Sequence, residues 1–358
     1  MWGSFSYNGL VEMRKFGLLI LLICICCSQD DNFHSSSKEI VKNEPDYYVL
    51  DPIVGHIHKS NAKRYYVWPE HKDGHLVLKT NNLGFRRDTD TFTGKHDKIR
   101  ILFTGDSQID GVVNNSESCC TILENLLNHA VNDIRYEVIN SGVGYYYPHN
   151  YLGIIKKYLY LAPDFFMVTF YGGNNFLKTC AFIGCQRSDN HKYKAKLQEV
   201  QSFNPGGLGQ GLNQIYYFKF FPESQKISLK AVMDDFHSIK EICDFNNIKL
   251  IILLLPSIIE IEWYTDWLRL NKCKELLNLT NADLQINMKL LDELSVQLNS
   301  DKIEYLNLYD YLKSKDRKLF WNKDYHLNDY GHQILAETLF AKYKDIFCRV
   351  RKPEKNKS

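Results

Sequence analysis

Four short segments of the sequence carry the residue types that acyl transfer by a serine requires. They are Gly105-Asp106-Ser107, Asn140–Gly144 (NSGVG), Tyr171–Asn175 (YGGNN) and Asp324-Tyr325-His326. This chemistry needs a hydroxyl nucleophile, a base that takes its proton, a carboxylate that orients the base, and donors for the oxyanion. Taken alone, Gly-Asp-Ser is explained as well by Ser107 capping a helix. The four segments together favour the catalytic interpretation.

Each of the first three segments directly follows an apolar run that is typical of a buried strand. Expected strands are Ile99–Thr104, Tyr136–Asn140, Asp164–Phe170, Lys249–Leu255 and Ile303–Leu308, and expected helices are Glu117–Val131, Asn150–Leu161, Ser228–Asn246, Leu284–Leu298 and Asn328–Phe347. Strands that alternate with helices predict a parallel sheet covered on both faces. Such sheets place their sites beyond the carboxyl ends of the strands. The three segments are therefore expected at one edge of the sheet.

In this order on an α/β pattern, the four segments resemble those of the SGNH (GDSL-type) hydrolase family, over about residues 99–347. The resemblance implies a three-layer α/β/α sandwich with a flavodoxin-like parallel sheet. It also implies Ser107 as nucleophile, His326 as general base and Asp324 as the carboxylate that orients His326. The oxyanion hole would comprise the N–H groups of Ser107 and Gly142 with the side-chain amide of Asn174. No cofactor and no metal ion are expected.

Three positions depart from the family pattern. Gln108 stands where the family's nickname has leucine, and Asn175 stands where aspartate is usual and is expected to support the loop. One residue separates Asp324 from His326, whereas many members have two. The alternative to a triad is a Ser107–His326 dyad in which a backbone carbonyl holds the imidazole.

The chain divides into three parts. Residues 1–27 are predicted to be a signal segment, 28–97 a tether and a small β-rich collar, and 98–350 the hydrolase domain. Residues 176–226 interrupt the alternation with an irregular insertion that contains Gly-Gly-Leu-Gly-Gln-Gly. A loop of this length is usually functional or disordered, so we expect it to overhang the site.

The N-terminal segment indicates export. Met13-Arg14-Lys15 precedes an apolar run, Phe16–Cys27, that is too short to span a membrane. The first residue is then Met1 or Met13. The run resembles a bacterial lipoprotein signal with Cys27 as the lipidated residue, and the alternative is an ordinary cleaved signal. A periplasmic or lipid-anchored location in a bacterial cell envelope is expected, with this segment as the membrane contact.

The cysteines, the histidines and the net charge indicate whether a disulfide, a metal site or a nucleic-acid-binding surface is expected. Cys180 and Cys185 are close enough to form a disulfide in an exported protein. Four others are expected to be buried apolar residues: Cys119, Cys243, Cys273 and Cys348. His56 and His58 alternate along one strand face, but without a third ligand we expect surface histidines. The formal net charge of +2 gives no reason to expect nucleic acid.

The substrate is predicted only by class. Aromatic residues suited to stacking on sugar rings are Tyr145, Tyr146, Tyr147, Trp263 and Trp267. With the expected envelope location, they favour a carbohydrate O-acyl ester, such as an O-acetyl group. The alternatives are a lipid ester, acyl transfer to a glycan, and a surface protein that binds glycan without catalysis.

Overall fold

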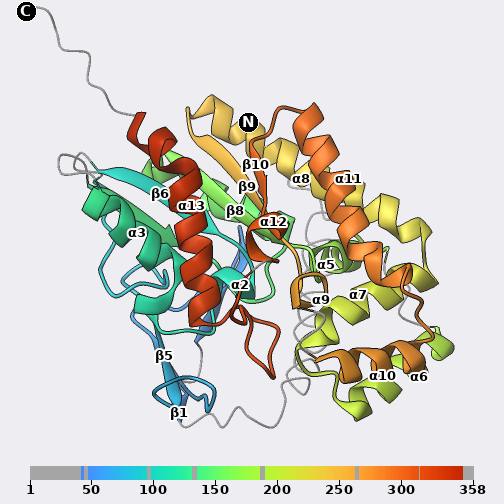
Figure 1. Ribbon diagram of the computed structural model, residues 1–358. Coiled ribbons are helices and arrows are strands. Elements are labelled where there is room, and N and C mark those ends of the chain that lie inside the picture. Colours follow the sequence, from blue (N-terminus) through green and yellow to red (C-terminus); the bar gives the residue numbers. More distant parts are fainter. Residues whose placement is uncertain are drawn as a thin grey trace, which may run out of the picture.

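A five-stranded parallel sheet forms the centre of the molecule (Figure 1). The computed structural model describes residues 42–43, 47–94, 98–130, 135–185, 190–262, 266–313 and 315–349. The strand order is β10-β9-β8-β6-β7, with bounds β6 Ile99–Thr104, β7 Tyr136–Asn140, β8 Phe165–Tyr171, β9 Lys249–Leu255 and β10 Tyr305–Asn307. Every residue of β6, β7 and β8 is buried, as expected for parallel strands covered on both faces.

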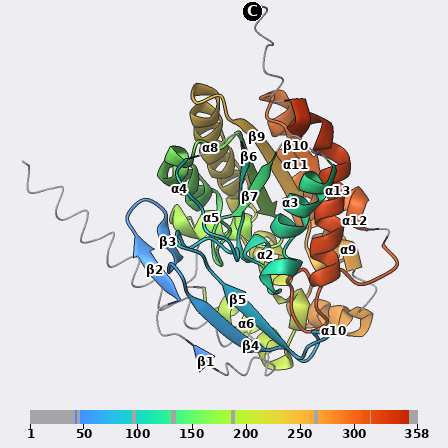
Figure 2. The same ribbon diagram turned by 90° about the vertical axis from the view of Figure 1, so that its left-hand side faces the viewer.

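Helices cover the two faces of this sheet (Figure 2). On one face α3 (Cys119–Ala130) packs against α13 (Asp329–Arg349), and on the other α4 (Pro148–Tyr158) packs against α8 (Glu223–Phe245). Helix α11 (Ile286–Ser300) lies beside α8. The three-layer α/β/α architecture predicted from the alternating pattern is confirmed.

The N-terminal strands form the predicted β-rich collar. Strands β1 (Lys42–Asn43), β4 (Lys63–Val67) and β5 (His75–Lys79) make an antiparallel sheet, and β2 (Tyr48–Asp51) pairs with β3 (Gly55–His58). The collar shares a small core with the main domain: Tyr47, Ala62, Trp68, Leu76, Leu78, Val113 and Trp321. Figure 2 shows these blue strands on the side of the molecule where α2 (Ser107–Asp110) lies. The collar is therefore packed onto the domain that carries the predicted site.

Most of the described residues in 176–185 and 190–226 are helical, so the prediction of an irregular loop is wrong. They contain most of α5 (Asn175–Phe182), then α6 (His191–Phe203), the short turn η4 (Gly206–Leu208) and α7 (Gly209–Phe220). Three buried tyrosines of this segment are Tyr193, Tyr216 and Tyr217, and the first two stack with ring centroids 5.3 Å apart. The glycines interrupt the apolar periodicity of the sequence, but they serve close packing. A Cβ on Gly211 would come within 2.7 Å of the Ile259 side chain.

Two helices after β9 were not predicted, α9 (Ile258–Glu262) and α10 (Trp267–Leu277). The remaining short elements are η2 (Asn115–Glu117), η3 (Leu159–Leu161), η6 (Asp283–Gln285) and α12 (Tyr309–Leu312). Cys180 and Cys185 form the predicted disulfide. Cys119, Cys243 and Cys273 are buried as expected, whereas Cys348 is only half-buried near the end of α13. The signal segment, Cys27 and Trp263 lie outside the described residues. Within the described part of the chain, no helix combines the length and apolarity needed to cross a bilayer.

Candidate active site

The predicted nucleophile begins a short helix directly above the end of β6. Ser107 is the first residue of α2 (Ser107–Asp110), and Asp106 caps this helix by accepting a hydrogen bond from the Gln108 N–H at 3.0 Å. The first N–H groups of a helix have no acceptor within it, so the Ser107 N–H is available to an oxyanion. A Cβ on Gly105 would lie only 2.5 Å from the Ile109 side chain. Glycine at 105 therefore allows the sharp turn that presents the half-buried Ser107.

Asp324 and His326 are in direct contact. One carboxylate oxygen, Oδ1 of Asp324, accepts the backbone N–H of His326 at 2.9 Å and also forms a short hydrogen bond with the ring Nδ1. The other ring nitrogen, Nε2, is buried and has no hydrogen-bond partner among the described residues. Tyr325 does not intervene, since its ring lies beside the His326 ring with centroids 4.3 Å apart. The one-residue spacing thus permits the carboxylate to hold the ring, as the predicted triad requires; the catalytic roles remain predictions.

Gln108 connects the serine turn with the histidine loop. Its Nε2 donates to the carbonyl of Tyr325 at 2.9 Å, and its Oε1 accepts the N–H of Leu327 at 3.1 Å. These two backbone groups flank His326. Sequence reasoning noted Gln108 only as a departure from leucine, and no local signal indicated contacts more than 200 residues away.

The third segment meets the insertion. Asn174 is the N-cap residue of α5, and its Nδ2 donates to Oε1 of Gln210 at 2.9 Å. Because an amide NH₂ group has two hydrogens, this bond leaves one for an oxyanion. Asn175 donates to the Tyr151 hydroxyl at 2.9 Å and supports the loop as expected. Since a Cβ on Gly207 would lie 3.0 Å from the Asp324 carbonyl oxygen, the insertion contacts the histidine loop as well.

The N–H of Gly142, a predicted oxyanion donor, has an acceptor within its own loop. Its N–H donates to the side-chain Oδ1 of Asn140 at 3.0 Å. The lack of a side chain at 142 serves close packing, because a Cβ there would lie 2.7 Å from the backbone nitrogen of Asp110. Gly142 therefore allows its loop to approach α2, and its oxyanion role, like those of Ser107 and Asn174, stays a prediction. Tyr145, in the same loop, has a φ of 70°, which is unusual for a bulky residue.

A buried ion network beneath α2 was missed by sequence reasoning. Arg86 is 1 % exposed and binds Asp110 Oδ1 at 3.0 Å, and His58 Nε2 lies 3.2 Å from the other carboxylate oxygen. That oxygen also accepts the Gly144 N–H at 3.2 Å. Burial opposes ionisation, but His58 and Arg86 outweigh it and lower the pKa of Asp110 to about 2. The collar thus holds both α2 and the second loop, and the expectation of surface histidines is wrong: His58 is buried, and His56 Nε2 contacts the Gly144 carbonyl at 2.9 Å.

Electrostatics at the turn follow from burial. Burial raises the pKa of Asp106 above its ordinary value, while the charge of Lys178 acts in the opposite direction. Lys178 Nζ also lies over the Tyr145 ring, 5.5 Å from its centroid. A cation thus lies close to the turn that carries Ser107.

A second polar cluster holds the third loop from below. Gln214, on α7, donates to the Gly172 carbonyl at 2.6 Å and to Asn287 at 2.8 Å. Asn287 in turn contacts Glu260, whose carboxylate accepts the Ser257 N–H at 2.6 Å. Burial raises the pKa of Glu260 to about 7. The cluster joins the insertion to the carboxyl ends of β8 and β9.

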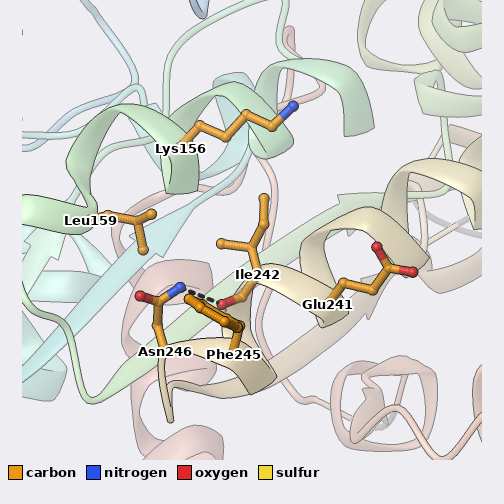
Figure 3. Close-up of a pocket in the computed structure, with 6 residues that line it drawn as sticks. All are labelled: Lys156, Leu159, Glu241, Ile242, Phe245 and Asn246. Carbon is orange, nitrogen blue, oxygen red and sulfur yellow. Dashed lines mark hydrogen bonds between the residues drawn. The ribbon is translucent and has the colours of Figure 1, made fainter.

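A pocket lies between α4 and α8 (Figure 3). It is lined by Lys156, Leu159, Glu241, Ile242, Phe245 and Asn246. Leu159 and Asn246 precede the amino ends of β8 and β9, which is the opposite edge of the sheet from Ser107. Among the described residues, no group of three or more His, Cys, Asp or Glu side chains could hold a metal ion.

Comparison with known proteins gives structural likenesses only. No family model and no curated protein matches the sequence. A member of the lipolytic protein G-D-S-L family from Veillonella parvula is 14% identical, with 70% of this chain and 99% of that chain covered and a TM-score of 0.39. The acetyl xylan esterase AlAXEase is 18% identical, with 68% of this chain and 99% of that chain covered and a TM-score of 0.39. The psychrotrophic esterase EstA from Pseudoalteromonas sp. is 11% identical, with 70% of this chain and 100% of that chain covered and a TM-score of 0.37.

Proposed function

We propose that this chain is a serine ester hydrolase of the SGNH type that works through an acyl-enzyme. The observation that carries the proposal is the pairing of Asp324 with His326 Nδ1, which leaves the buried Nε2 unpartnered among the described residues. A ring held in this way carries its proton on Nδ1 and presents Nε2 as a base. Gln108 attaches the loop of this base to the turn of Ser107.

The reaction follows from these positions. His326 takes the Ser107 proton during attack on the ester carbonyl, and Asp324 stabilises the imidazolium that forms. The Ser107 N–H and the Asn174 amide stabilise the oxyanion, and loss of one such donor typically costs about 2.7–4 kcal/mol. The alcohol leaves with the proton from His326. Water activated by His326 then releases the acid.

For the substrate we propose a carbohydrate O-acyl ester, with O-acetyl as the leading acyl group. Tyr145 and Tyr147, half-buried after β7, support a sugar-stacking surface, whereas Tyr146 is fully buried and cannot contribute. The proposed location is the exterior of a bacterial cytoplasmic membrane, either periplasmic or lipid-anchored. The Cys180–Cys185 disulfide supports it, because disulfides persist in oxidising compartments.

The test is labelling with a fluorophosphonate together with turnover of short aryl esters and acetylated sugars. Ser107→Ala should abolish labelling and turnover without a change in Tm. His326→Ala should do the same, and the double variant should be no worse than either single variant, since the residues act as a unit. A correctly folded Ser107→Ala variant with undiminished turnover would refute the serine mechanism.

A further inference from the structure

Gln108 makes two hydrogen bonds that fix the distance between the serine turn and the histidine loop. Its side chain is fully buried; Nε2 donates to the Tyr325 carbonyl and Oε1 accepts the Leu327 N–H. We propose that Gln108 is a positioning residue, which holds the His326 ring where Nε2 can take the Ser107 proton. This inference rests on the proposed function.

The other hydrogen bonds at His326 shape its loop but do not reach α2. The His326 N–H goes to Asp324, and the His326 carbonyl accepts the Trp321 N–H at 3.1 Å. Both partners belong to the same loop. The Gln108 bonds instead span 217 and 219 residues and end on the backbone groups on either side of His326. They consequently connect the residues on either side of His326 directly to α2.

The amide of glutamine suits this position because it offers a donor and an acceptor together, as a neighbouring backbone would. Leucine, the residue of the family nickname, has a similar size but no polar atom. Gln108→Leu would leave the half-buried Tyr325 carbonyl and the buried Leu327 N–H without these partners. Buried polar groups move to regain hydrogen bonds. A misplacement of about 1 Å at a catalytic group can cost about 10²-fold in rate.

The experiment compares Gln108→Leu with wild-type enzyme on a short aryl ester. We expect kcat about 10²-fold lower and KM within about threefold, because the buried Gln108 side chain orders the base and does not bind substrate. Asn128→Leu is the matched control. Asn128 makes the same donor and acceptor pair with the backbone of Tyr136, at 3.1 and 2.8 Å, at the amino end of β7. Its replacement should lower Tm and leave kcat unchanged.

Gln108→Glu supplies a second readout and decides the matter if the leucine variant does not fold. Glutamate keeps the acceptor for Leu327 and regains the donor for Tyr325 only when protonated. The ratio of its kcat to that of wild type should therefore rise at least threefold between pH 8 and pH 5. A kcat of Gln108→Leu within threefold of wild type, an equal kcat loss in Asn128→Leu, or a flat ratio for Gln108→Glu overturns the inference. Undiminished activity of Ser107→Ala would instead refute the proposed function, whereas an inactive Ser107→Ala beside a fully active Gln108→Leu refutes this inference alone.

Discussion

Replacement of Asp324 by asparagine separates the charge of this residue from its geometry. The carboxylate oxygen that contacts His326 Nδ1 also accepts the His326 backbone N–H at 2.9 Å. In Asp324→Asn that N–H requires an acceptor at the same place, so it selects the amide orientation with oxygen toward the ring. The proton then stays on Nδ1, and Nε2 remains a base.

Asp324→Asn is therefore expected to lower kcat only through the loss of the negative charge beside His326. A hydrogen bond to a charged group contributes about 1.5–3 kcal/mol and a neutral one about 0.5–1.5 kcal/mol. The difference of about 1–2 kcal/mol corresponds to a kcat about 5- to 30-fold lower. An inverted amide would force the wrong tautomer, which costs about 10⁴-fold in a triad of this kind. Asp324→Ala removes the acceptor altogether and should fall toward the rate of His326→Ala.

The assay is kcat and kcat/KM for an aryl ester, with His326→Ala as the floor. Asp310→Asn is the control, because the same substitution there affects only an exposed ion pair with Lys313. A kcat of Asp324→Asn equal to wild type would show that the carboxylate is dispensable and favour the dyad. A loss near 10⁴-fold would refute the inference that the backbone N–H fixes the amide orientation.

Three further substitutions test the surroundings of the site. Arg86→Met leaves the buried Asp110 carboxylate without its guanidinium and should lower the free energy of unfolding by about 3–5 kcal/mol in urea titrations. The control is Arg317→Met, which removes a cation over an aromatic ring and should lower the free energy of unfolding by less than about 1 kcal/mol. Equal losses would contradict a stabilising role for the ion network around Asp110. Because the folded pKa of Glu260, about 7, lies above its ordinary 4.5, its contribution to stability is complete below about pH 4.5 and is lost as the pH rises through 7. Glu260→Gln should therefore lose less Tm than wild type between pH 5 and pH 8, and identical slopes in thermal scans would argue against the shift. Gly142→Ala places a Cβ 2.7 Å from the backbone of α2. It should lower the free energy of unfolding in urea by about 1–3 kcal/mol and should also lower kcat. Unchanged values of both quantities would overturn this expectation.

The sheet and its order of elements were readable in the sequence. Strands β6, β7 and β9 have the predicted bounds, because strands buried on both faces are rich in apolar residues along their whole length. The helical insertion was not readable. Its glycine run resembles a flexible loop, yet Gly207 and Gly211 pack against Asp324 and Ile259. A glycine in a sequence is compatible with a flexible loop or with a backbone packed closely against another segment. Only the residues that surround it in the folded structure distinguish these two cases.

The sequence alone determined the residue types proposed for the site, since Ser107, Asn174 and His326 stand in short motifs that together, in this order, predict acyl transfer by a serine. Tertiary structure decided which atoms meet. In the folded chain the Gly142 N–H donates to Asn140, and Gln108 contacts the histidine loop, which lies more than 200 residues away in the sequence. Local preferences act over a few residues along the chain, whereas a side-chain hydrogen bond forms only after packing of the sheet has brought distant segments within about 3 Å.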